Sequence, residues 1–198
     1  MSNPTIAYYN KNAVDFYAST IHADMSVHYL KFLGLLTPTA YILDLGCGSG
    51  RDSKYFIDKG YRVEAVDGSL ELCKIASNYL SKPVRHLLFE ELDYVETFDA
   101  IWASASLLHI PKNELPNILV KISRALKMDG FLYAAFKYGD FCGERNGRIF
   151  TDLTEQALSE IIKHIECFTI IETAVTFDVR QEHSDEKWLN AIIQKQEA

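Results

Sequence analysis

The sequence has 198 residues, 48% hydrophobic and 24% charged, which is typical of one soluble globular domain. Its formal net charge of −7 argues against broad nucleic-acid binding, because such binding depends on lysine and arginine side chains that neutralise phosphates. No apolar run approaches the ~20 residues of a membrane span, and residues 1–12 lack the apolar core of a signal peptide. The four cysteines form neither a CxxC pair nor a zinc-type cluster. We therefore expect a cytoplasmic protein with no metal, no membrane partner and no nucleic-acid partner.

Apolar residues recur with helical and strand-like spacing in turn along most of the chain. The predicted elements, in chain order, are one or two helices over 13–33, a strand over 41–45, a helix over 51–59, a strand over 61–66, a helix over 69–80, strands over 84–88 and 98–104, a helix over 113–126, a strand over 131–137, a helix over 154–164 and strands over 168–179 and 187–194. Ser69 and Thr154 are the predicted N-caps of their helices.

This alternation predicts the fold class. Strands that alternate with helices favour a doubly wound, Rossmann-like α/β sheet that is mostly parallel, with helices on both faces. The connection 180–186 is short and polar, which suits an antiparallel pair at the sheet edge better than a crossover. We expect a single domain over 1–198, in which 1–40 form an N-terminal helical cap and 41–198 form the core.

The segment 42–50 reads Ile-Leu-Asp-Leu-Gly-Cys-Gly-Ser-Gly, so a buried strand runs into three alternating glycines and then into a helix. Glycines there allow a tight turn and let a ligand approach the backbone. A dinucleotide fingerprint is GxGxxG, but Gly50 comes one residue early and Arg51 stands where that pattern needs glycine. Asp67 ends the next strand, where a carboxylate can accept hydrogen bonds from both ribose hydroxyls. An NAD-binding oxidoreductase is therefore the less favoured alternative.

The pattern Asp44-x-Gly46-x-Gly48-x-Gly50, with Asp67 at the end of the next strand, resembles the class I S-adenosylmethionine-dependent methyltransferases. The resemblance continues through the strand 98–103 and the turn 126–130 and covers nearly the whole chain. It implies a seven-stranded sheet whose last strand is antiparallel, with S-adenosyl-L-methionine as the cofactor. The stretches 46–53, 136–139 and 143–148 further resemble the tellurite-resistance branch of these methyltransferases, which suggests a small acceptor.

The resemblance also implies roles for individual residues. Gly46, Gly48 and Gly50 would line the methionine and ribose portions of the cofactor. Asp44 would orient the glycine loop, and Asp67 would hold the ribose. The other cofactor-binding candidates are Cys47, Arg51, Gly68, Ser69, Phe89, Glu90, Ala103 and Ser104.

Residues on the acceptor side are harder to identify, because methyl transfer needs a general base only when the acceptor must lose a proton. The catalytic candidates are His109, which follows the fourth strand, and Tyr17 of the N-terminal helices. The substrate-binding candidates are Tyr8, Tyr9, Tyr138, Arg145 and Arg148. The glycines of 138–150 predict a mobile loop over the acceptor, and its two arginines indicate an anionic acceptor. Ordinary packing or solvent exposure is the alternative for each of these side chains.

We expect methyl transfer to a small molecule or small anion, since the chain has no appended domain for recognising a macromolecule. The main alternative is a non-catalytic protein that binds S-adenosylmethionine or a partner, because methyl transfer leaves no obligatory catalytic signature. The sequence leaves the acceptor, its reacting atom and the oligomeric state open.

Overall fold

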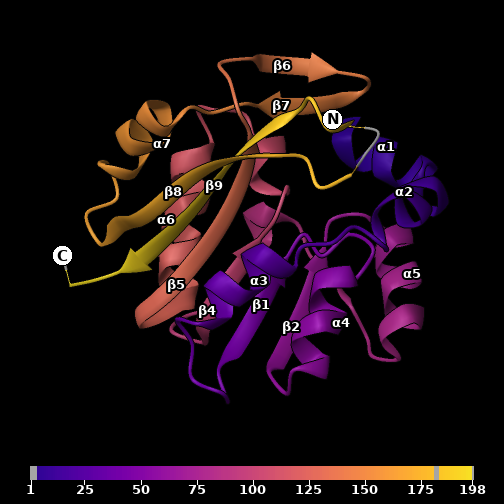
Figure 1. Ribbon diagram of the computed structural model, residues 1–198, viewed down its shortest axis with the longest axis horizontal. Helices are drawn as coiled ribbons and strands as arrows, with labels where there is room; N and C mark the ends of the chain where they lie inside the picture. Colours follow the sequence, from indigo (N-terminus) through magenta and orange to yellow (C-terminus); the bar gives the residue numbers. More distant parts are fainter. Residues whose placement is uncertain (1–3, 181–182, 198) are drawn as a thin grey trace.

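The computed structural model describes residues 4–180 and 183–197 and contains a seven-stranded sheet covered by helices (Figure 1). Its strands are β1 (Tyr41–Leu45), β2 (Arg62–Asp67), β3 (Arg85–His86), β4 (Phe98–Ala103), β5 (Leu126–Lys137), β8 (Phe168–Phe177) and β9 (Lys187–Lys195), in the order β3-β2-β1-β4-β5-β9-β8. The pairs from β3 to β5 are parallel, and β9 is antiparallel to both of its neighbours. The predicted Rossmann-like fold class is confirmed.

The helices are α1 (Pro4–Lys11), α2 (Ala13–Thr20), α3 (Ser26–Leu33), α4 (Arg51–Asp58), α5 (Leu70–Leu80), α6 (Leu115–Ala125) and α7 (Glu155–Ile162), with 3-10 turns at Phe89–Glu91 (η1) and Leu107–His109 (η2). Ser69 and Thr154 cap α5 and α7 as predicted, because each side chain accepts a backbone N–H of its helix. The periodicity placed the first helix only from residue 13 onward, whereas α1 begins at Pro4, a residue tolerated in the first turn. Among the described residues, no helix is long and apolar enough to cross a membrane.

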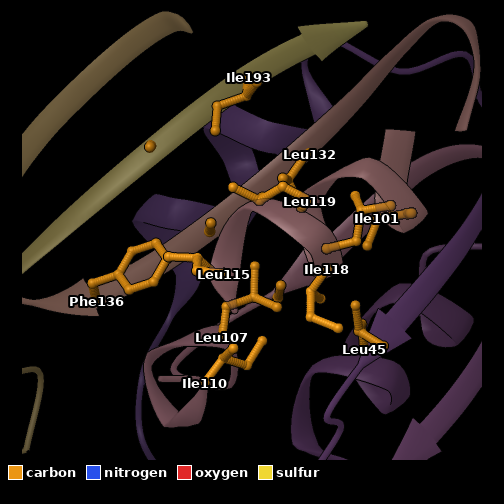
Figure 2. Close-up of a cluster of buried hydrophobic side chains, with 14 of the residues drawn as sticks. Leu45, Ile101, Leu107, Ile110, Leu115, Ile118, Leu119, Leu132, Phe136 and Ile193 are labelled. Atoms are coloured by element: carbon orange, nitrogen blue, oxygen red, sulfur yellow. The ribbon is translucent and has the colours of Figure 1, made fainter. Parts of the chain in front are cut away.

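The sheet separates two layers of apolar side chains. In β4, Ile101 and Ala103 pack toward α6 and α7, whereas Ala100 and Trp102 pack toward α3 and α4. The apolar face of α6 packs onto this sheet as its helical spacing predicted (Figure 2). Burying each such side chain stabilises the fold by roughly 1.5–3 kcal/mol, so the core holds the carboxyl ends of β1, β4 and β5 in fixed positions.

The antiparallel pair that the short connection 180–186 predicted, β8 and β9, lies at one edge of the sheet. Strand β9 lies between β5 and β8, and β8 forms the edge. The short connection does make the two strands antiparallel neighbours. Which of them pairs with β5 depends on contacts across the sheet, and the connection itself carries no information about that choice.

The segment 138–150, predicted as a mobile loop, contains most of a β-hairpin. Its strands are β6 (Cys142–Arg145) and β7 (Arg148–Thr151), which pair antiparallel and lie beside α1 (Figure 1). Asn146 and Gly147 form the two-residue connection with φ of 51° and 76°, the pattern of a type I′ turn. The Asn-Gly pair between two short strands is the sequence signal that a loop prediction from glycine content overlooked.

Candidate functional site

A cavity of about 960 Å³ opens at the carboxyl ends of the parallel strands. Its walls include Gly46–Ser49 after β1, Gly68 after β2 and Ser104–Ser106 after β4. Helices α1 and α2 and the β6–β7 hairpin supply the remaining sides toward β5. In doubly wound sheets this edge is where ligands bind, because the loops that leave neighbouring strands diverge there.

The glycine loop turns sharply between β1 and α4. Gly46, Gly48 and Gly50 have φ of 80°, 54° and 81°, in the left-handed region that other residues adopt only with strain. A Cβ on Gly46 would lie 2.5 Å from Cβ of Ser106, and one on Gly48 would lie 2.9 Å from Cε1 of Phe16. The loop thus needs glycine both for its backbone conformation and for the close packing of neighbouring side chains.

Asp67 lies buried at the end of β2 and holds the glycine loop. Its Oδ2 accepts the Gly48 N–H at 2.9 Å, and its Oδ1 accepts the Ser69 N–H at 2.7 Å. Burial raises the pKa of Asp67, although these two backbone donors favour the charged form. Each carboxylate oxygen retains a further lone pair, so Asp67, which lines the cavity, can still accept hydrogen bonds from a ligand.

Asp44 lies beneath the loop and does not line the cavity. Ser53 Oγ donates a hydrogen bond of 2.6 Å to its Oδ2. Burial and the nearby Asp52 carboxylate raise the pKa of Asp44. A cationic group bound above it would favour the ionised form.

Arg51 begins α4, where the helix dipole does not favour a cation, and a buried acid compensates for this. Arg51 Nε donates to Asp52 Oδ1 at 2.6 Å, and Nη1 donates to the Thr20 carbonyl at 3.3 Å. Asp52 also accepts from Trp102 Nε1 at 2.7 Å and from the Tyr29 hydroxyl. Burial alone would raise the pKa of Asp52, but the Arg51 guanidinium outweighs it and the pKa is lowered. The ion pair therefore fixes a guanidinium at the cavity wall.

At the other end of the cavity, Tyr9 of α1 contacts His109 of η2. The Tyr9 hydroxyl lies 2.8 Å from His109 Nε2, and His109 Nδ1 lies 2.7 Å from the Ile149 carbonyl. Burial lowers the pKa of His109 to about 4, so the ring is neutral at physiological pH. Burial raises the pKa of Tyr9, so its hydroxyl keeps its proton. Both side chains line the cavity.

The hairpin brings two arginines to the same wall. Arg145 pairs with Asp152 at 2.5 Å, but no carboxylate of the described residues lies within 4.0 Å of the Arg148 guanidinium. The Arg148 guanidinium lies 4.4 Å from the Tyr8 ring and 5.1 Å from the Phe150 ring. The Nε atoms of both arginines are buried and lack a hydrogen-bond partner in the described part of the chain.

Helix α1 bridges the two ends of the cavity. Near the glycine loop, Asn10 Oδ1 accepts the Ser69 hydroxyl at 2.8 Å and the Glu71 N–H at 3.2 Å. Near the hairpin, the Thr5 hydroxyl accepts the Ile149 N–H at 2.9 Å. The helix therefore covers the cavity from the β2 side to the β7 side.

The structure brings most, but not all, of the predicted site residues to this cavity. Those that line it are Gly46, Cys47, Gly48, Arg51, Asp67, Gly68, Phe89, Glu90, Ser104, His109, Tyr8, Tyr9, Arg145 and Arg148. Those that do not line it are Asp44, Gly50, Ser69, Ala103, Tyr17 and Tyr138.

The outlying residues have identifiable physical reasons for their positions. Phe16 of α2 faces the cavity, and Tyr17, one helical step further round, packs against Tyr79 of α5. Tyr138 is exposed to solvent just beyond the end of β5, and the preceding residue, Lys137, lines the cavity instead. Gly50 lies against Ala76 of α5, so the lack of a side chain at this position allows close packing against that helix.

Several lining residues were not anticipated from the sequence. The unanticipated lining residues include Phe16, Ser106, Lys137, Asp178, Arg180 and Asn190. Asn190 is a buried polar residue within the apolar strand β9, which is a signal that the strand pattern alone does not explain. In the described part of the chain, no group of three or more His, Cys, Asp or Glu side chains could hold a metal ion.

Residues 42–130 match the family model of the methyltransferase domain. An uncharacterized methyltransferase of Staphylococcus carnosus (strain TM300) is 27% identical over 154 residues, 73% of this chain and 74% of that protein. The sarcosine/dimethylglycine N-methyltransferase of Halorhodospira halochloris is 32% identical over 120 residues, 55% of this chain and 42% of that protein.

Among solved structures, the chain is similar to Burkholderia thailandensis 1,6-didemethyltoxoflavin-N1-methyltransferase with bound 1,6-didemethyltoxoflavin and S-adenosylhomocysteine. The two share 23% identity with a TM-score of 0.74, over 100% of this chain and 92% of that chain. The sheet order and the glycine loop at its cavity define the Rossmann-like methyltransferase fold. The methyltransferase domain matched over residues 42–130 and the similar methyltransferases, together with this fold, support an S-adenosylmethionine-dependent methyltransferase with S-adenosylmethionine as its cofactor.

Proposed function

We propose that this enzyme transfers a methyl group to a small acceptor that carries an anionic group, and that Arg148 binds that anion. The carrying observation is the Arg148 guanidinium, which lines the cavity with a buried, unpartnered Nε and no carboxylate within 4.0 Å among the described residues. A buried donor without a partner costs about 1–3 kcal/mol, so a ligand that satisfies it is favoured. Bidentate pairing with a carboxylate or an oxyanion suits the planar guanidinium.

The cofactor subsite in this proposal runs from Asp67 to Arg51. The Asp67 carboxylate would accept the ribose hydroxyls, and the Phe89 ring would border the adenine. Arg51, held in place by Asp52, would contact the methionine carboxylate. The chemistry of this donor set fits the cofactor, because an acid, an apolar face and a cation line one cavity. S-adenosylmethionine supplies the methyl group and the sulfur leaving group, and the protein supplies position and electrostatics.

The acceptor side would lie between α1 and the β6–β7 hairpin, with Tyr8, Tyr9 and His109 around it. We propose that residues 1–40 act as a cap on the core 41–198 and complete this pocket. Sarcosine and dimethylglycine, which the name of one relative gives as its acceptors, are themselves small carboxylates. That likeness supports an anionic acceptor without fixing its identity.

The test is a screen of small acceptors followed by a comparison of arginine variants. Tellurite, small thiols and sarcosine are the first trials, and turnover of tellurite would support the tellurite-resistance branch. Arg148→Ala should raise the acceptor KM tenfold to a hundredfold, as expected for the loss of about 1.5–3 kcal/mol of charged hydrogen bonding. Its affinity for S-adenosylhomocysteine should stay within threefold.

Arg124→Ala is the matched control, since Arg124 is exposed on α6 and does not line the cavity. The double variant Arg145→Ala, Arg148→Ala should have the larger effect on KM or kcat. If Arg148→Ala matches Arg124→Ala in acceptor KM, the anion site does not exist.

A further inference from the structure

Tyr9 and His109 both line the cavity in which the acceptor would lie, and they contact each other there. The phenol oxygen is 2.8 Å from His109 Nε2, so the histidine nitrogen that could act as a base already has a partner. Both side chains expose their remaining surface to the cavity. An acceptor in that cavity can therefore reach His109 Nε2 only through the Tyr9 hydroxyl.

The hydrogen bonds fix the direction of proton donation. The Ile149 carbonyl can only accept, so the His109 nitrogen 2.7 Å away, Nδ1, carries the ring proton. In a neutral ring Nε2 then has a free lone pair and accepts the Tyr9 proton. One lone pair of the Tyr9 oxygen accepts a hydrogen bond from Arg148 Nη1, and the other is left to accept a hydrogen bond from another molecule.

A cation lies next to the same phenol oxygen. Arg148 Nη1 is 3.5 Å from the Tyr9 oxygen, and the Arg148 guanidinium lies 5.8 Å from the Tyr9 ring. A nearby positive charge stabilises a phenol oxygen that is giving up its proton. The arrangement thus contains an acceptor for the Tyr9 proton and a charge that favours its departure.

We propose that Tyr9 is the catalytic residue that takes the acceptor's proton, and that His109 is a positioning residue that receives the Tyr9 proton in turn. This inference rests on the proposed methyl-transfer function. The bond from the acceptor atom to the methyl carbon forms while the bond from that carbon to the cofactor's sulfur breaks, and sulfur keeps the electron pair. The acceptor's proton passes to the Tyr9 oxygen, and the Tyr9 proton passes to Nε2. After product release the extra proton leaves through Tyr9 to solvent.

The relay selects an acceptor class. Because the imidazole is buried beside Arg148, it is a weak base, with a pKa of about 4. A weak base suits a nucleophile whose proton becomes strongly acidic only as the new bond forms, such as a hydroxyl oxygen. A thiol that ionises by itself near neutral pH would not need the relay. The expected acceptor therefore carries an anionic group and an O–H or N–H nucleophile that does not ionise by itself near neutral pH.

The first experiment needs no turnover. In nitrogen-15 NMR of the full chain with S-adenosylhomocysteine, His109 should show a protonated Nδ1 and an unprotonated, hydrogen-bonded Nε2. Tyr9→Phe should move the Nε2 signal toward that of an unbonded ring nitrogen, whereas Tyr79→Phe, on the exposed face of α5, should not. A protonated Nε2, or an Nε2 signal unchanged in Tyr9→Phe, would overturn the proposal.

The second experiment uses two probes of the same shape, 3-hydroxybenzoate and 3-mercaptobenzoate, at pH 7.5. Tyr9→Phe should lower kcat with the hydroxyl probe at least tenfold and change kcat with the thiol probe less than threefold. His109→Gln should retain more activity than His109→Leu, because the glutamine amide oxygen can still accept a hydrogen bond from the Tyr9 hydroxyl. An equal loss on both probes would contradict the relay. If the proposed function itself fails, the parent enzyme methylates neither probe, while the NMR spectrum still decides whether the proton relay is assembled.

Discussion

At the scale of single residues, the cofactor end depends on one carboxylate. Asp67 is buried, accepts two backbone N–H groups and keeps free lone pairs toward the cavity. Asp67→Ala should weaken S-adenosylhomocysteine binding tenfold to a hundredfold, since hydrogen bonds to charged groups are worth about 1.5–3 kcal/mol. Isothermal calorimetry measures this directly, and circular dichroism checks the fold. Binding as tight as in the parent would show that Asp67 is not the ribose ligand.

Gly48 allows a second test at this scale, because its side-chain position is crowded by Phe16. Gly48→Ala should weaken S-adenosylhomocysteine binding more than tenfold, as it strains a positive φ and displaces the Phe16 ring. Gly60→Ala is the matched control: Gly60 also has a positive φ, of 90°, but nothing lies within 4 Å of its side-chain position. Equal losses of S-adenosylhomocysteine affinity in the two variants would show that crowding at the glycine loop does not affect cofactor binding, and that backbone strain alone accounts for the loss.

The candidate site was partly predictable residue by residue. The glycines and Asp67 follow a fixed spacing around one strand–turn–helix unit, so local sequence suffices to suggest them. His109 was a candidate by type, but its pairing with Tyr9 joins residues 100 positions apart and has no sequence signal. The sequence indicates Tyr17 as a candidate, but Phe16 is the α2 side chain that lines the cavity, because the two positions differ by one step around the helix.

At the scale of elements, α1 is a cover fastened at two ends. Asn10 makes the two hydrogen bonds on the α5 side. Asn10→Ala should loosen the helix: at about 0.5–1.5 kcal/mol per hydrogen bond, amide exchange over residues 4–11 should quicken roughly tenfold. Hydrogen-exchange mass spectrometry measures this, with the exposed Asn78→Ala on α5 as control. Unchanged exchange in Asn10→Ala would show that α1 is held by other contacts.

Elements with strong local signals were predicted well. Helix α6 and strand β1 follow from periodic apolar residues, and the caps Ser69 and Thr154 follow from side-chain chemistry. The glycines of 138–150 predict a mobile loop, whereas the structure has the hairpin β6–β7, in which Asn146 and Gly147 form a tight turn. Its strands are only four residues each, too short for alternation to stand out.

At the scale of the whole molecule, the buried imidazole couples stability to pH. The pKa of His109 is about 4 in the folded protein, against about 6.5 in an unfolded chain. Between pH 6.5 and 4 the histidine is protonated in the unfolded state but stays neutral in the folded state. The free energy of unfolding therefore decreases as the pH falls through this range. Between pH 6.5 and 5 the loss amounts to up to roughly 2 kcal/mol.

The expected result is a melting temperature that falls between pH 7 and 5 by several degrees more in the parent than in His109→Gln, which cannot titrate. Differential scanning calorimetry at both pH values, with the exposed His22→Gln as control, provides the comparison. A parent and a His109→Gln variant with the same pH dependence would show that His109 is not held neutral by burial.

By itself, the sequence determined the class of fold and the cofactor loop. Both depend on short-range patterns: apolar periodicity selects helix or strand, and a glycine-rich turn after a buried strand is confined to about ten residues. Only the tertiary structure decided that β9 lies inside the sheet, that the hairpin meets α1, and that Arg148, Tyr9 and His109 share one wall. These contacts join segments far apart in the chain, and packing across the sheet selects them, which no local pattern records.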